Sequence, residues 1–339
     1  MAPLLEVSGL TVDFDRPGRS LLSGSRAEPF RALGPVDLRI DTGDSVAIVG
    51  ESGCGKTTLA RCLTGFQIPS GGEILMEGRS LAGRRDPAMR RRIQMVFQDP
   101  TGSLNPTMSI ERSLVEAIRN EPTVPHADRI DRARELLAMV DLPDAVLKLR
   151  PRQLSGGQRQ RVAIARALAV SPDVLVADEA VSALDVSVQA TILNLLRRLQ
   201  RELDLTLVFI THNLAVVRQI TNRTVVLYRG RTAEEGPTGS LLDNPQHPYT
   251  SMLRAAVPSM EAPGPKSPTV TTEDPSETTA SGCNFAPRCP MAVTPTCATS
   301  VPELLPLSDR LVACHVVHGE VGAAPTRTDD VEGPWVLDR

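Results

Sequence analysis

Five segments of the chain show the hydrophobic patterning of strands. Residues 4–14 largely alternate apolar and polar positions, and residues 36–40 alternate again, as half-buried strands do. Residues 45–49, 173–177 and 205–210 are short continuous apolar runs, which are typical of strands buried in a mainly parallel sheet. Apolar residues at helical intervals separate the last two runs. Strands that alternate with helices predict an α/β fold with ligands at the carboxyl ends of the strands.

The spacing of apolar residues becomes helical between residues 109 and 140, where strand alternation is absent. The apolar positions there are Leu114, Ile118, Ile130, Ala133, Leu136, Leu137 and Val140. We therefore expect a helical subdomain at about residues 99–160, inserted into one large domain that spans residues 1–257.

The composition changes after this large domain. Residues 262–282 are rich in Pro, Thr, Ser and Glu and have almost nothing to bury, which predicts a linker over residues 258–282. A small cysteine-containing module is expected at residues 283–318, followed by a polar tail at 319–339.

Composition and charge exclude some classes of function. The chain has 339 residues, 41% of them hydrophobic, which is enough for one sizeable core and an appendage. Its net charge of -3 provides no basic stripe, so nucleic acid is not an expected partner. Without an 18-residue apolar run or a signal peptide, we expect a soluble protein that stays in the cytoplasm, where its six cysteines are poor candidates for disulfides.

A glycine-rich loop follows the apolar run 45–49 and precedes a helix, which is the order that a P-loop requires. Its glycines let successive backbone amides face a β-phosphate at the helix N-terminus. Lys56 would reach the β- and γ-phosphates, Thr57 would bind Mg²⁺, and Thr58 suits the α-phosphate side. The predicted ATP-binding residues of this loop are Gly50, Glu51, Ser52, Gly53, Cys54, Gly55, Lys56, Thr57 and Thr58.

Acidic residues follow the second apolar run. Asp178 and Glu179 end that strand, so their carboxylates should emerge at the edge of the sheet that carries the P-loop. Asp178 is expected to hold Mg²⁺ through water, and Glu179 fits the general base that polarises the attacking water. His212 follows the third run by one threonine, although a lone histidine after a strand is more often a surface or core residue.

The sequence Leu154-Ser155-Gly156-Gly157-Gln158 opens a further helix, which Ser155 can cap. This motif, together with the P-loop, Asp178-Glu179 and His212, resembles the ABC ATPase family. The resemblance implies a P-loop NTPase fold in which Ser155, Gly156, Gly157 and Gln158 meet the γ-phosphate held by a second ATPase chain, with Asp185 in the matching D-loop. It also implies that Gln98 senses Mg²⁺ and the attacking water, and that His212 contacts the γ-phosphate.

Three features of the site remain open at this level. The aromatic candidates for stacking on adenine are Phe14 and Phe30, of which Phe14 is favoured because it ends the first strand. Pro-Thr usually follows the catalytic glutamate in this family, whereas Ala180-Val181 stands here, and Asn213 replaces a common Asp. These departures leave hydrolysis expected, but they put its rate in question.

The motifs Phe97-Gln98-Asp99-Pro100, Ser103-Leu104-Asn105-Pro106 and Asn244-Pro245-Gln246-His247-Pro248-Tyr249-Thr250 look like those of the dipeptide, oligopeptide and nickel importer ATPases. That resemblance implies ATP and Mg²⁺ as ligands, a second ATPase subunit, two transmembrane permease subunits and an extracytoplasmic solute-binding protein. It also implies a peripheral location on the cytoplasmic face of the membrane. The rival interpretations are a non-transport ABC ATPase that acts on DNA or the ribosome, and a regulatory subunit with weakened hydrolysis.

Four cysteines lie in the C-terminal module, Cys283, Cys289, Cys297 and Cys314, separated by five, seven and sixteen residues. Four thiolates are the number required by a tetrahedral zinc ion or an iron–sulfur cluster. The spacing lacks a CxxC zinc pattern, and unliganded cysteines are a third alternative. The resemblance of the surrounding residues to the C-terminal module of oligopeptide importer ATPases implies a four-iron four-sulfur cluster.

Overall fold

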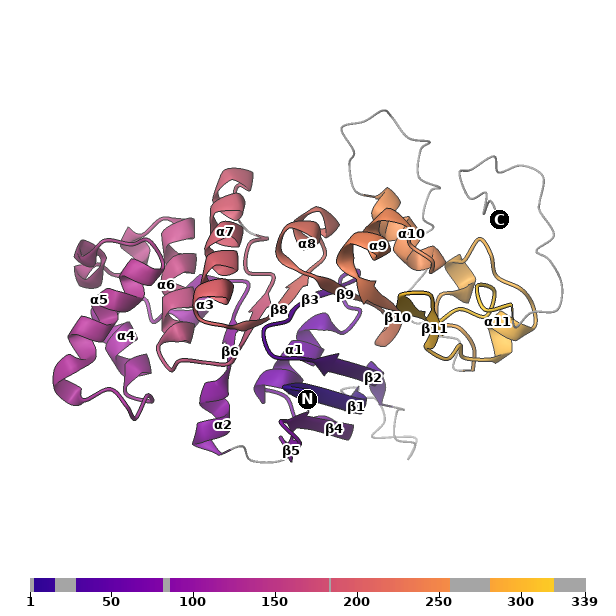
Figure 1. The fold of residues 1–339 in the computed structure, drawn as a ribbon, viewed down its shortest axis with the longest axis horizontal. Helices are drawn as coiled ribbons and strands as arrows, with labels where there is room; N and C mark the ends of the chain where they lie inside the picture. Colours follow the sequence, from indigo (N-terminus) through magenta and orange to yellow (C-terminus); the bar gives the residue numbers. More distant parts are fainter. Residues whose placement is uncertain (1–2, 16–28, 82–85, 183, 257–280, 320–339) are drawn as a thin grey trace, which may run out of the picture.

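The structure is a computed structural model, and it describes residues 3–15, 29–81, 86–182, 184–256 and 281–319. Two sheets and a set of helices build the molecule (Figure 1). The strands are β1 (Leu5–Phe14), β2 (Phe30–Ile40), β3 (Ser45–Val49), β4 (Gly71–Met76), β5 (Arg79–Ser80), β6 (Ile93–Val96), β7 (Val174–Asp178), β8 (Thr206–Thr211), β9 (Arg223–Tyr228), β10 (Arg231–Pro237), β11 (Leu305–Leu307) and β12 (Arg310–Val312). The helices are α1 (Lys56–Thr64), α2 (Pro87–Arg92), α3 (Pro100–Ser103), α4 (Ile110–Ile118), α5 (Arg129–Met139), α6 (Gly156–Leu168), α7 (Val186–Glu202), α8 (Leu214–Ile220), α9 (Thr238–Asp243), α10 (Pro248–Ala255) and α11 (Thr296–Thr299).

The larger sheet has eight strands in the order β11-β12-β10-β9-β3-β8-β7-β6. Its strands from β9 to β6 are parallel, as the continuous apolar runs predict, because a strand covered by helices on both faces has no polar side. In register, Val49 at the end of β3 pairs with Thr211, and Asp178 pairs with Ile210. The P-loop, the acidic pair and the loop after β8 therefore leave the sheet at one edge.

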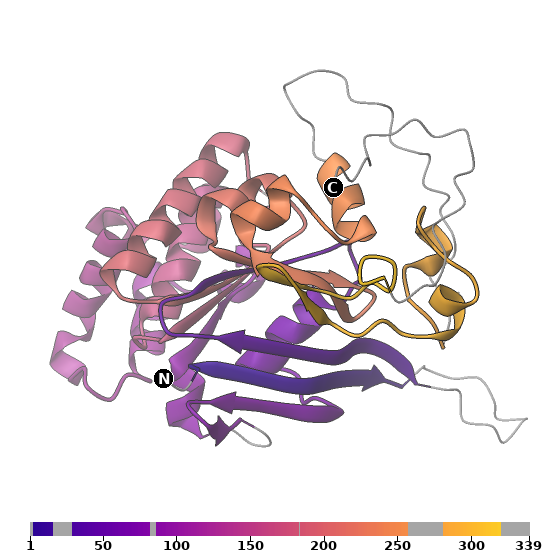
Figure 2. The same cartoon turned by 45° about the vertical axis from the view of Figure 1, so that its right-hand side comes forward.

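The C-terminal module is continuous with this sheet. The hairpin of β11 and β12 pairs with β10 through Glu234 opposite Val312, so the module extends the core instead of standing apart from it. Most of the predicted linker and the predicted tail lie outside the described residues. Figure 2 shows the hairpin beside the orange helices of the core.

A second, four-stranded antiparallel sheet has the order β2-β1-β4-β5. Figure 2 shows it below α1, which lies between the two sheets. Leu59 and Leu63 of α1 are fully buried in a core that also contains Leu10 of β1 and Ile48 of β3. This core fixes the P-loop helix from both sides.

Helices α3 to α6 lie in and just beyond the region 99–160 where the sequence predicts a helical subdomain, and they lie at one end of the molecule (Figure 1). Leu114, Ile118 and Leu136 are fully buried there, as their spacing predicts. Ile130 was expected on the buried face, but it is 44% exposed. It lies in the first turn of α5. None of the helices in the described ranges has the length and apolar character required to cross a membrane.

Candidate active site

The P-loop joins β3 to α1 and is packed too closely for side chains at two of its glycines. Gly50 and Gly55 have φ of 154° and 106°, in the region that favours glycine. A Cβ on Gly50 would lie 2.2 Å from the Leu227 carbonyl oxygen, and one on Gly55 would lie 2.8 Å from that of Ala32. The loop is thus clamped between β9 and β2, which fixes the backbone that would cradle a phosphate.

Lys56 is buried, with 5% of its surface exposed, and its ammonium group points back into the loop. Nζ donates hydrogen bonds to the carbonyl oxygens of Gly50 and Glu51, each at 2.8 Å, and lies 3.7 Å from Cys54 Sγ. Burial raises the pKa of the Cys54 thiol, so this neighbour is neutral. The Lys56 ammonium group thus donates to neutral acceptors. An anionic phosphate oxygen can take their place and form a stronger, charge-assisted hydrogen bond.

Thr57 and Asp178 lie together at the start of α1 and the end of β7. The Thr57 hydroxyl donates to Asp178 Oδ1 at 3.3 Å. Burial raises the pKa of Asp178, and the hydrogen bond from Thr57 opposes that shift. Hydroxyl and carboxylate oxygens are the donors that Mg²⁺ prefers, so the residues fit this ion, which when bound neutralises charge on the β- and γ-phosphates.

Glu179 is held in a left-handed conformation, with φ of 46°, which is uncommon for a residue other than glycine. Its backbone N–H donates to the Ile210 carbonyl at 2.9 Å. Its Oε2 accepts a hydrogen bond from Gln98 Nε2 at 3.0 Å, and its Oε1 lies 3.1 Å from His212 Nδ1. The tertiary structure thus brings the three residues that were predicted as catalytic, Gln98, Glu179 and His212, around one carboxylate.

Ser182 belongs to the same cluster, three residues before Asp185 of the predicted D-loop. Its hydroxyl donates to the Glu179 carbonyl at 3.0 Å and lies 3.4 Å from Gln98 Nε2. Ser182 lies four residues after Asp178, the last residue of β7, and this position in the sequence does not predict the contact. Ser182 thus holds both Gln98 and the backbone of Glu179.

The departures from the family pattern are accommodated locally. Ala180 and Val181 are 2% and 3% exposed and contribute to the core beneath the cluster. Asn213 caps α8, since its Oδ1 accepts from the Ala215 N–H at 3.0 Å, as an aspartate would.

The motif at the start of α6 packs against the start of α7. Ser155 caps the helix by accepting from the Gln158 N–H at 3.2 Å, and Gln158 completes the reciprocal bond. A Cβ on Gly157 would lie 2.6 Å from Val188 Cγ1 of α7. Asp185 is the residue at the N-cap of α7. Close packing on α7 explains Gly157.

Phe14 and Phe30, the two candidates for an adenine platform, stand opposite each other in the β1–β2 register. They are 40% and 46% exposed, so neither ring is taken up by the core. Both remain available to a ligand.

The four C-terminal cysteines are all within the described residues, but they are not arranged as a metal site. Cys297 and Cys314 are buried, and Cys283 and Cys289 are half-buried against the core around Phe285. Burial raises the pKa of Cys283, Cys289 and Cys314, to about 12 for Cys289, so these thiols are protonated in the chain described here. Across the described residues, no group of three or more His, Cys, Asp or Glu could hold a metal ion. The predicted iron–sulfur cluster is therefore not supported.

Two residues from the last third of the chain contact the P-loop, and neither was assigned that role from the sequence. The hydroxyl of Tyr249, which is fully buried, accepts from the Glu51 N–H at 2.8 Å. Arg288 pairs with the Glu51 carboxylate. Tyr249 belongs to the motif at residues 244–250, so this motif was the feature of the sequence that could have pointed to the contact with Glu51.

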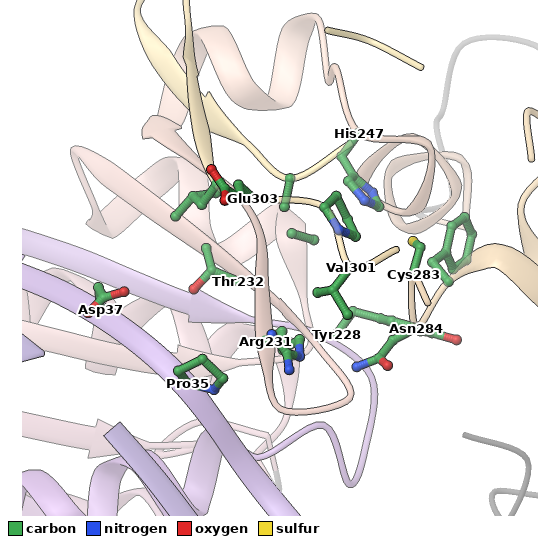
Figure 3. Close-up of a pocket in the computed structure, with 15 residues that line it drawn as sticks. Pro35, Asp37, Tyr228, Arg231, Thr232, His247, Cys283, Asn284, Val301 and Glu303 are labelled. Atoms are coloured by element: carbon green, nitrogen blue, oxygen red, sulfur yellow. The ribbon is translucent and has the colours of Figure 1, made fainter. Parts of the chain in front are cut away.

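A separate cavity of about 440 Å³ lies between β2, β10 and the C-terminal module. Figure 3 shows Asp37, Arg231, His247 and Cys283 around it. Burial lowers the pKa of His247 to about 4, so its imidazole is neutral and accepts from the Tyr249 N–H at 3.0 Å. This cavity contains none of the predicted ATP-binding residues.

Comparison with known proteins agrees with this geometry. The family described as ABC transporter matches residues 33–182, and that described as oligopeptide/dipeptide transporter, C-terminal region, matches residues 233–297. A probable peptide ABC transporter ATP-binding protein, y4tS of Sinorhizobium fredii, is 46% identical over 92% of this chain and 90% of its own length. The di/tripeptide transport ATP-binding protein DppF of Pseudomonas aeruginosa is 43% identical over 84% of this chain and 90% of its own.

Among solved structures, a dimeric ATP-binding cassette, MJ0796, in a post-hydrolysis state with ADP and phosphate is similar. It has a TM-score of 0.60 and 31% identity, and the match covers 69% of this chain and 98% of that one. The P-loop, the cluster around Glu179 and the match along nearly the whole chain lead to one conclusion. The chain belongs to the ABC transporter family, in the group of ATP-binding proteins related to oligopeptide and dipeptide transporters.

Proposed function

We propose that this chain is the ATP-binding and ATP-hydrolysing subunit of an importer that carries di- and oligopeptides across a membrane. The observation that carries the proposal is the cluster of Gln98, Glu179 and His212 beside the P-loop, in a chain whose C-terminal region matches that of oligopeptide transporters. The relatives named for peptide transport cover nearly the whole chain, which supports the same substrate class.

The hydrolytic step follows from the residues around Glu179. The Glu179 carboxylate accepts a proton from water as the water oxygen attacks the γ-phosphorus. The bond between the γ-phosphorus and the bridging oxygen breaks, and ADP and phosphate leave. Gln98 and His212 hold the carboxylate in place through its two oxygens. A positioned general base of this kind accelerates a reaction by about 10²- to 10⁴-fold.

The remaining ATP contacts come from two chains in this proposal. Lys56 and the P-loop amides would bind the phosphates, Thr57 and Asp178 would hold Mg²⁺, and Phe14 would stack on adenine. The positive N-terminus of α6, with Ser155 and its glycines, would contact the ATP bound to a second ATPase subunit. The dimeric state of the solved cassette supports this arrangement.

The permease contact is proposed at the helical insertion. A cavity of about 360 Å³ is lined there by Leu104, Asn105, Pro106, Glu116 and Arg166. Arg166 donates to the Ser103 carbonyl and thereby ties the loop to α6, the helix that carries the second-chain ATP contact. Two permease subunits would dock on this surface from the cytoplasmic face of the membrane, with a solute-binding protein on the other side.

Reconstitution in proteoliposomes with the permease subunits tests the proposal. Uptake of labelled di- and tripeptides that needs MgATP, and that is lost in Glu179→Gln while the complex still assembles, is the expected result. ATPase activity that nucleic acid stimulates, without any association with permease, would instead favour a non-transport ABC ATPase.

A further inference from the structure

The C-terminal module reaches the phosphate-binding loop through one ion pair. Arg288 Nη1 donates to Glu51 Oε2 and Nη2 donates to Glu51 Oε1, each at 2.9 Å. The two side chains are 17% and 38% exposed. A paired, two-bond contact between a guanidinium and a carboxylate is stronger and more directional than a single surface bond.

Arg288 is itself held in place by aromatic neighbours. Its guanidinium carbon lies 5.8 Å from the ring centre of Tyr228 and 6.0 Å from that of Phe285. Nη1 also lies within 3.4 Å of the Tyr228 hydroxyl. Because Tyr228 ends β9 and Phe285 is buried in the core, the guanidinium is oriented before any ligand arrives.

Glu51 is an unfavourable residue for a phosphate site unless its charge is paired. It stands between Gly50 and Ser52, and its own carbonyl accepts from Lys56. A carboxylate in a loop that binds a polyanion repels that polyanion. Pairing with Arg288 offsets this charge, and the bond from the Glu51 N–H to Tyr249 holds the backbone at the same point.

We propose that Arg288 is a positioning residue of the nucleotide site, which neutralises and orients Glu51 so that the C-terminal module sets the affinity of the P-loop for MgATP. The proposal rests on the proposed binding of ATP at this loop. It makes the cysteine-containing module part of the ATP site through Arg288.

The test measures the dissociation constant of MgATP by calorimetry on the full chain, together with KM and kcat. Arg288→Gln should weaken binding about fivefold to tenfold and raise KM to match, with kcat within about twofold, because the unpaired Glu51 charge acts on binding. Glu51→Gln/Arg288→Gln should return within about twofold of the wild type, since no unpaired charge remains. Arg288→Lys keeps the charge and should recover most of the affinity.

Arg39→Gln is the matched control, because Arg39 forms an exposed ion pair with Asp41 at 3.4 Å away from the loop. It should leave the dissociation constant unchanged. A double variant as weak as Arg288→Gln would overturn the proposal, because it would assign Arg288 a purely structural role. Unchanged binding in Arg288→Gln would overturn it as well.

If Arg288→Gln does not fold, the dissociation constant of MgATP for Glu51→Gln tests the proposal by itself. Equal or tighter binding supports the proposal, and binding weakened more than about threefold overturns it. A wild-type chain that binds no MgATP would contradict the proposed function itself, so the two failures are distinguishable.

Discussion

Replacement of Arg310 by methionine should destabilise the fold by removing one partner of a buried ion pair. Glu234 and Arg310 join β10 to β12, with side chains 0% and 6% exposed and 3.2 Å between Oε1 and Nη1. Glu234 also accepts from the backbone N–H groups of Gln246 and His247, each at 3.0 Å, so it organises the start of the segment that ends in Tyr249.

The magnitude follows from what the variant leaves behind. Loss of one member of a buried pair costs about 3 to 5 kcal/mol, because the other charge stays desolvated. Glu234 keeps two backbone donors in Arg310→Met, so we expect the lower end, about 3 kcal/mol. Methionine fills much of the space of the arginine stem, which limits any cavity contribution.

Urea unfolding followed by far-ultraviolet circular dichroism measures this loss, with an expected midpoint shift of about 1 M. Arg31→Met is the control, since Arg31 pairs with Asp13 at 2.8 Å with 55% of its side chain exposed. An exposed pair contributes about 1 kcal/mol or less. A loss below about 1 kcal/mol in Arg310→Met would refute the reasoning, because it would mean that Glu234 is not left as a buried unpaired charge.

Three further predictions concern catalysis, pH and nucleotide binding. Glu179→Gln should reduce kcat by about 10²-fold or more while MgATP still binds, and unchanged turnover would remove Glu179 from its role as base. Burial lowers the pKa of His247 from 6.5 to about 4, so the folded state binds fewer protons than the unfolded state between these values. Stability should fall by about 3 kcal/mol as pH falls through that window, whereas His247→Asn, which keeps an acceptor for the helix cap, should show a shallower fall in chemical denaturation. Phe14→Ala should raise the KM for ATP about fivefold through loss of stacking on adenine. Phe30→Ala, at the position opposite Phe14, is the control, and an equal rise in KM in both variants would contradict the choice of Phe14.

The sequence was informative wherever function depends on local order along the chain. A strand, a glycine loop and a helix in succession place Lys56 and Thr57 at a helix N-terminus, whatever packs around them. Asp178, Glu179 and His212 follow buried parallel strands, and parallel strands deliver their carboxyl ends to one edge. The contact of Glu179 with His212 and Gln98 follows from that edge, although no spacing in the chain predicts the 3.0 and 3.1 Å distances.

Local pattern failed where an element is short or where its partner is remote. The strands β11 and β12 have three residues each, too few to show a period of two, so the sequence did not predict that the module extends the larger sheet. The resemblance to oligopeptide importer ATPases implied an iron–sulfur cluster, but among the described residues no metal-binding group is found, and the spacing of cysteines alone does not determine how their sulfur atoms are arranged.

The sequence by itself therefore determined the α/β class, the P-loop and the identity of the residues at the strand ends, because these depend on neighbours within about ten positions. Only the tertiary structure decided that Arg288 and Tyr249 support Glu51 from 237 and 198 residues away. Such contacts arise when a sheet brings distant segments together. The periodicity of the sequence does not predict which charged side chains will then lie opposite each other.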